Sequence, residues 1–150
     1  AFRSALDKGT IFHFAGHYVA NRKSPDRSKF LLSDGDLTIE DLSRQIVRAP
    51  KLVILSACDS GIERYYSGEG MIGAARVFLA AGVPTVIGSR WGVDSEATRE
   101  LMTAFHTQRT DAPTEDALKN AQMLMIQGRA QYVEPYFWAG ITPFGGFSIS

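Results

Sequence analysis

Three continuous apolar runs are the clearest pattern in this chain of 150 residues. They lie at residues 10–15, 51–56 and 84–89 and show little polar alternation, which is typical of strands covered on both faces of a sheet. A shorter strand is expected at 30–33, ended by a turn or hairpin signal, Asp-Gly, at 34–35. Because strands alternate with helical segments, the pattern predicts an α/β fold with a parallel sheet.

Helices are predicted where apolar residues recur every three or four positions. Thr38 begins a sequence typical of a capping box and precedes a helix to about Arg48. The segment 70–81 is apolar nearly all round, which predicts a buried helix, with Gly82 as its left-handed cap. Residues 57–69 form a long connection, and long connections in compact domains are commonly functional.

Two further helices are expected in the second half of the chain. Asp94 or Ser95 caps a helix to about Thr107, and Thr114 caps another to Gln127. The residues expected to face inward are Thr98, Leu101, Met102 and Phe105 on the first helix, and Leu118, Ala121, Leu124 and Met125 on the second. Short edge strands are expected at 137–141 and 147–150.

Composition narrows the possible partners. With 45% apolar and 21% charged residues, the chain is expected to form one domain, 1–150. Sixteen basic and sixteen acidic residues cancel, which argues against direct contact with nucleic acid or an anionic membrane. No apolar run is long enough to span a bilayer. A single cysteine forms no internal disulfide, which favours a cytoplasmic location. The absent initiator Met and the helix-like start at 1–8 suggest a piece of a longer protein.

The strand ends carry the candidate chemistry. Cys58, the sole cysteine, comes just after the run 51–56, and His17 comes just after the run 10–15. The carboxyl ends of parallel strands meet at one edge of a sheet, where ligands bind. A thiol next to an imidazole that takes its proton is the arrangement of a cysteine hydrolase. The alternative is that Cys58 is a small buried apolar residue, as single cysteines often are.

Five segments around and after these residues carry recognisable motifs. They are Phe12-His-Phe-Ala-Gly-His17, Leu52-Val-Ile-Leu-Ser-Ala-Cys-Asp-Ser-Gly61, Gly68-Glu-Gly-Met-Ile-Gly-Ala-Ala-Arg-Val-Phe-Leu79, Ala81-Gly-Val-Pro-Thr-Val-Ile87 and Ser89-Arg-Trp-Gly-Val-Asp94. These motifs resemble the CHAT family of caspase-like cysteine peptidases, and the similarity continues through most of the chain in the family's order.

The resemblance implies a fold and a protein context. The expected fold is a caspase-like, three-layer α/β/α sandwich with a mostly parallel sheet that lacks its N-terminal part. CHAT domains often form the C-terminal portion of longer proteins, commonly after tetratricopeptide repeats. The implied partners are a protein substrate and either a regulatory protein or an upstream repeat domain.

The resemblance also implies a role for each residue at the strand ends. His17 is expected to act as base and then acid, and Cys58 as the nucleophile of an endopeptidase that forms a thioester, without metal or cofactor. The backbone N–H groups of Tyr18 and Cys58 are expected to hold the oxyanion. The family usually has Gly where this chain has Tyr18. This departure supports a second hypothesis, a catalytically silent domain that binds other proteins.

Four residues are candidates for substrate binding. By analogy with caspase-like enzymes, the loop after 84–89 lines the pocket for the residue before the scissile bond, which brings in Arg90, Trp91 and Asp94. Asp59 and Asp94 favour a basic substrate residue, whereas Arg90 favours an acidic one. Trp91 is equally consistent with packing, and Asp94 with helix capping.

Two other motifs do not support a site. Residues 68–73 match the dinucleotide fingerprint, but they follow a long connection instead of a strand. His13 and His17 have the spacing of some metal ligands, yet on a strand their side chains lie about 13 Å apart. His13 is therefore expected to be a hydrogen-bonded core residue. His106, in the last turn of its helix, suits the helix dipole and requires no function.

Overall fold

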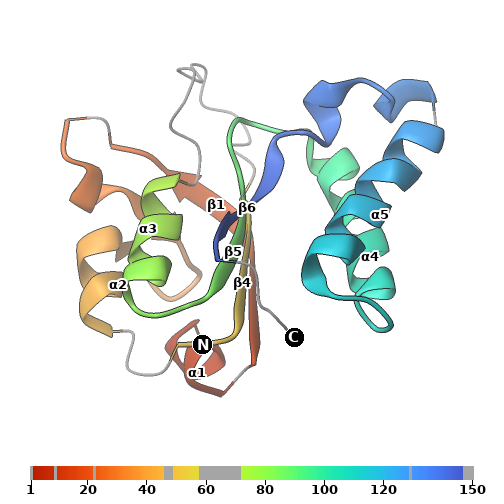
Figure 1. The fold of residues 1–150 in the computed structure, drawn as a ribbon. Helices are drawn as coiled ribbons and strands as arrows, with labels where there is room; N and C mark the ends of the chain where they lie inside the picture. Colours follow the sequence, from red (N-terminus) through yellow and green to blue (C-terminus); the bar gives the residue numbers. More distant parts are fainter. Residues whose placement is uncertain are drawn as a thin grey trace.

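The computed structural model describes residues 2–8, 10–21, 23–45, 49–57, 72–128 and 130–146. Within these ranges the strands form one six-stranded sheet in the order β3-β2-β1-β4-β5-β6 (Figure 1). The strands are β1 (Ile11–Val19), β2 (Lys29–Leu31), β3 (Leu37–Thr38), β4 (Leu52–Ala57), β5 (Thr85–Ser89) and β6 (Ile141–Gly145). The helices are α1 (Phe2–Lys8), α2 (Ile39–Gln45), α3 (Ile72–Ala80), α4 (Ser95–Gln108) and α5 (Thr114–Gln127), with 3-10 turns η1 (Pro25–Arg27), η2 (Ala130–Tyr132) and η3 (Pro135–Phe137).

The sheet is mixed. Its three central strands, β1, β4 and β5, are parallel, whereas β2, β3 and β6 each run antiparallel to the neighbour on their inner side. A short turn can join β2 to β3 only as an antiparallel hairpin. The α/β class is confirmed, but the expectation of a mostly parallel sheet holds only for the centre.

Helices cover both faces of the sheet (Figure 1). On β4, Val53 and Leu55 belong to the cluster that includes side chains of α1, α2 and α3. Leu52 and Ile54, which alternate with them, belong to the cluster that includes side chains of α4 and α5. The continuous apolar character of this strand therefore follows from burial on both faces.

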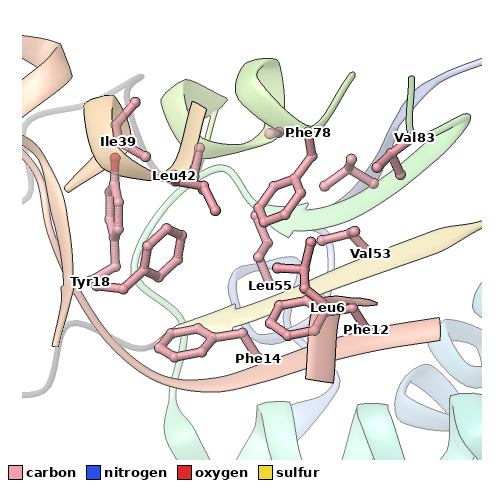
Figure 2. Packing of buried hydrophobic residues seen from close by; sticks show 14 of the residues in the cluster. Leu6, Phe12, Phe14, Tyr18, Ile39, Leu42, Val53, Leu55, Phe78 and Val83 are labelled. Carbon is pink, nitrogen blue, oxygen red and sulfur yellow. The ribbon is translucent and has the colours of Figure 1, made fainter. Parts of the chain in front are cut away.

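Aromatic rings fill much of the core on the first face (Figure 2). Phe14 and Phe30 meet edge to face, with ring centroids 4.9 Å apart and planes at 80°. Phe12 lies near Phe78, with centroids 6.2 Å apart. Phe30 and Phe78 are completely buried. This cluster holds β1 against the helices on that face.

Several local signals in the sequence are confirmed. Thr38 Oγ1 accepts from the N–H of Asp41 at 3.0 Å, which is the N-cap bond of a capping box, and the Thr38 hydroxyl donates to the Asp41 carboxylate. Asp94 caps α4 by accepting from the N–H groups of Glu96 and Ala97. Gly82 follows α3 with φ of +93°, the left-handed conformation that favours glycine.

Other element boundaries differ from the expectation. Thr114 is the first residue of α5 and not its cap; Pro113 holds that position without a side-chain hydrogen bond. Leu124 was expected to face inward, but it is 47% exposed. The predicted strand at 137–141 is wrong, because Pro135 begins a 3-10 turn there and β6 starts only at Ile141. The expected connection at 57–69, except Ala57 in β4, and the expected strand at 147–150 lie outside the described residues.

Candidate active site

The pairing of β1 with β4 brings the two candidate motifs together. The strands are parallel, and Gly16 is the register partner of Ala57. In the sequence, His17 directly follows Gly16, and Cys58 directly follows Ala57. Cys58 and its neighbour Asp59 lie outside the described residues. Their proposed roles therefore stay predictions, but the register of the two strands agrees with them.

His17 lies inside a strand and not beyond its end. The sequence predicted that the strand stops at about residue 15, whereas β1 continues to Val19. The extension forms because residues 17–19 pair with β2, with His17 opposite Leu31. Ala15 and Gly16 pair with Ser56 and Ala57 of β4, which keeps the backbone extended up to His17. The His17 side chain remains exposed.

A pocket of about 720 Å³ lies between α4 and the strands β1 and β4. It extends along β1 from His13 to His17, with Ala15 and Gly16 between them. Ser56 of β4 also lines it. From α4 the lining residues are Ser95, Thr98, Arg99, Met102, Thr103, His106 and Thr107. The candidate histidine thus opens onto a space large enough for a ligand or a short peptide segment.

Two hydrogen bonds connect three side chains in the wall of this pocket. His13 Nδ1 lies 3.0 Å from His106 Nε2, and His13 Nε2 lies 2.9 Å from Ser56 Oγ. The two imidazoles also stack, with centroids 5.1 Å apart and planes at 28°. The prediction that His13 is hydrogen-bonded is confirmed. Its placement in the core is wrong, because the side chain is on the exposed pocket face of β1.

The environment of this pair favours neutral imidazoles. Desolvation, reinforced by the neighbouring His106, lowers the pKa of His13 to about 4. Desolvation, followed by the positive charge of Arg109, also lowers the pKa of His106. His106 was expected to act only as a cation near a helix end, and the contact with His13 shows a different environment.

The side chain of Tyr18 has a structural role. Its ring is buried in the aromatic core (Figure 2). The centroid of this ring lies 5.1 Å from that of Phe30. Burial raises the pKa of its hydroxyl. Because Tyr18 lies in a paired strand, its backbone conformation is one that any residue with a Cβ adopts. The contribution of its N–H to an oxyanion hole stays a prediction.

The residues after β5 have structural contacts. The Trp91 indole donates to the carbonyl of Tyr136 at 3.0 Å and covers Gly140, where a Cβ would lie 2.7 Å from the ring. Asp94 caps α4, as described above. The backbone N–H of Arg90 donates to the carbonyl of Gly140 at 2.8 Å, and its side chain is exposed. The substrate contacts predicted for Arg90, Trp91 and Asp94 stay predictions, in addition to these structural roles.

The described ranges contain neither a larger cluster of metal-ligating side chains nor a membrane-spanning helix. There, no three His, Cys, Asp or Glu side chains converge as metal ligands. Nor is any described helix long and apolar enough to cross a membrane. Sequence reasoning missed the pairing of His13 with His106, because 93 residues separate them and no local motif marks the contact.

A comparison with models of protein families identifies the family to which this chain belongs. The family model of the CHAT domain matches residues 1–146. The chain belongs to the CHAT domain family. This family is related to caspase-like cysteine peptidases. The CHAT domain accounts for nearly the whole chain, including β1 with His17 and β4, which leads to Cys58.

Two curated relatives carry longer chains. Tetratricopeptide repeat protein 28 of Mus musculus is 29% identical over 121 residues, which is 81% of this chain and 5% of the relative. Tetratricopeptide repeat protein 28 of Homo sapiens is 28% identical over 95 residues, 63% of this chain and 4% of the relative. This CHAT domain therefore spans about one twentieth of the relatives it matches.

Proposed function

We propose that this CHAT domain is a cysteine endopeptidase that uses His17 and Cys58 as a catalytic dyad. The observation that supports the proposal best is the parallel register of β1 and β4, in which Gly16 pairs with Ala57. The two residues that follow this pair in the sequence are the histidine and the only cysteine of the chain. The pocket beside His17 adds a space in which a substrate segment can bind.

In the proposed reaction, His17 accepts the proton of the Cys58 thiol, and the thiolate attacks the scissile carbonyl carbon. The resulting oxyanion accepts hydrogen bonds from the backbone N–H groups of Tyr18 and Cys58. When the carbon–nitrogen bond breaks, His17 gives its proton to the leaving amine and a thioester remains. His17 then activates a water molecule that hydrolyses the thioester and frees the enzyme.

The finer parts of the proposal concern recognition and context. Asp59, Arg90, Trp91 and Asp94 are proposed to contact the substrate near the scissile bond. The helices on both faces of the sheet are consistent with a caspase-like α/β/α sandwich. The tetratricopeptide repeat relatives support an upstream repeat region, which we propose regulates a cytoplasmic protease.

A second candidate function is a catalytically silent module that binds other proteins. Tyr18 favours it, because the residue after the histidine has its side chain buried in the core, where the family usually has glycine. A silent domain would keep the α/β scaffold and the pocket without an activated thiol. The two functions therefore differ in the reactivity of Cys58.

The decisive test is cleavage of a positional-scanning fluorogenic peptide library by the full-length protein. We expect turnover that falls by about 10³-fold or more in Cys58→Ala and in His17→Ala, as when members of a catalytic unit are removed. Leu124→Ala, on the exposed face of α5, is the matched control and should leave turnover unchanged. An absence of turnover, combined with a thiol that alkylates only above about pH 8, would favour the binding module instead.

A further inference from the structure

The pocket contains a pair of histidines that the proposed reaction does not use. His13 on β1 and His106 on α4 face each other across the pocket wall, with His13 Nδ1 and His106 Nε2 3.0 Å apart. The other ring nitrogen of His13, Nε2, is hydrogen-bonded to Ser56 Oγ on β4. Three elements thus place two imidazole nitrogens side by side in a space that opens to a ligand.

We propose that His13 and His106 form a binding site for a divalent transition metal ion of the Zn²⁺ or Cu²⁺ class. His13 Nδ1 and His106 Nε2 are the protein ligands, and water or a bound molecule in the pocket occupies the remaining positions. The site is separate from the dyad of His17 and Cys58 and does not depend on whether that dyad is active.

The distance between the two nitrogens suits a shared ion. Zinc–imidazole bonds are about 2.0–2.1 Å long, so two nitrogens bound to one ion lie about 3.0–3.4 Å apart. The observed separation of 3.0 Å is at the short end of that range. Binding of an ion replaces the N–H···N hydrogen bond. His106 gives up the proton on Nε2 and keeps one on Nδ1, and both side chains rotate so that their lone pairs converge on the ion.

The contact with Ser56 prepares His13 as a ligand. When His13 Nε2–H donates to Ser56 Oγ, at 2.9 Å, the lone pair of His13 is on Nδ1, which faces His106. Histidines that bind metals usually donate their other ring N–H to an oxygen atom in this way, which fixes the tautomer and the orientation of the ring. Ser56 is therefore a positioning residue of the proposed site.

The coordination expected at this site is open. In the part of the chain that the structure describes, no third His, Cys, Asp or Glu joins the pair. Open positions are typical of sites where a metal ion binds an exogenous ligand, whereas structural zinc sites have four protein ligands. Imidazole nitrogens select ions such as Zn²⁺, Cu²⁺ and Ni²⁺ over Mg²⁺ or Ca²⁺. An ion here would stand in the same pocket as His17.

The test counts histidine ligands directly, since the whole chain has only three histidines. The 150-residue chain carrying Cys58→Ser, which removes the thiol as a competing ligand, is loaded with one equivalent of Cu²⁺. Pulsed electron paramagnetic resonance then counts the bound imidazoles, and calorimetry measures Zn²⁺ affinity. Variants in this background are His13→Gln, His106→Gln and Ser56→Ala, with His17→Gln as the matched control.

We expect two bound imidazoles in the parent and in His17→Gln, but at most one in His13→Gln or His106→Gln. Ser56→Ala should weaken Zn²⁺ binding by about 10-fold, as the loss of an outer-shell partner commonly does. Loss of an imidazole in His17→Gln, or fewer than two in the parent, would overturn the proposal. A second measurement identifies the ligands without histidine variants. Bound Zn²⁺ should protect His13 and His106, but not His17, from carbethoxylation, which mass spectrometry maps to each residue.

Discussion

The two faces of β1 differ more than its sequence suggests. On one face, Phe12, Phe14 and Tyr18 are buried in an aromatic core. On the other face, His13 and Ala15 are exposed in the pocket, although they alternate with the phenylalanines along the same strand. One face of the strand thus stabilises the domain, while the imidazoles of the other face line the pocket. Substitutions on neighbouring residues should therefore have very different effects.

The largest difference is expected between Phe14 and its neighbour Ala15. Phe14→Ala removes a buried ring that packs against Phe30 and Phe2, and should lower the free energy of unfolding by about 3–5 kcal/mol. Ala15→Ser, on the pocket face, should change it by about 0.5 kcal/mol or less. Chemical denaturation measures both. Equal losses at the two positions would show that the faces do not divide in this way.

A smaller effect is expected at Gly16, the position that follows Phe14 on the aromatic face of β1. A Cβ at this position would lie 2.7 Å from the end of the Phe14 ring, so Gly16→Ala must push that ring into the core. We expect a loss of about 1–3 kcal/mol in the free energy of unfolding, typical of overpacking. The measurement is again chemical denaturation of the purified variant.

A double substitution shows whether the ring of Phe14 is the cause. In a Phe14→Leu background the space over Gly16 is larger, so adding Gly16→Ala should cost less than in the parent chain. Equal costs in the two backgrounds would mean that the backbone of β1, and not the aromatic face, resists a side chain at Gly16.

Features encoded within a few residues could be predicted from the sequence. The capping box at Thr38, the Asp94 cap and the left-handed Gly82 each depend on local side-chain and backbone preferences. The strand β5, buried along its whole length, likewise showed itself as a continuous apolar run. The parallel direction of β1, β4 and β5 followed from their alternation with helices.

Features that depend on distant partners could not be predicted in this way. The extension of β1 through His17 requires β2, and the antiparallel edge strand β6 requires β5. Leu124 has the spacing of a core residue, yet the orientation of α5 leaves it exposed. The contact between His13 and His106 arises only when α4 lies along the pocket. Motifs in the sequence identified His17 and Cys58 as candidates, whose roles stay predictions, but no motif marked the pair of His13 and His106.

The smallest expected effect is a change in the pH dependence of stability, to which the pocket face should contribute and the aromatic face should not. The pKa of His13 is about 4 in the folded chain and about 6.5 when unfolded, so below about pH 6.5 the unfolded state binds more protons. Stability should fall as the pH drops through this window, with no further loss from this group below about pH 4. The nearby charged or titratable groups are His106, Arg109, Arg99 and His17.

The measurement compares the parent chain with His13→Gln by denaturation between about pH 7 and pH 5. The loss in the parent should be modest, because water reaches the pocket face and weakens the effect. His13→Gln should lose less stability over the same interval, since glutamine does not titrate, while Phe14→Leu on the other face should retain the slope of the parent. If His13→Gln and the parent lose stability equally, the imidazole of His13 is protonated as easily in the folded chain as in water. In that case the contact with His106 does not favour the neutral imidazole of His13. The pocket face then contributes no more to the pH dependence of stability than the aromatic face does.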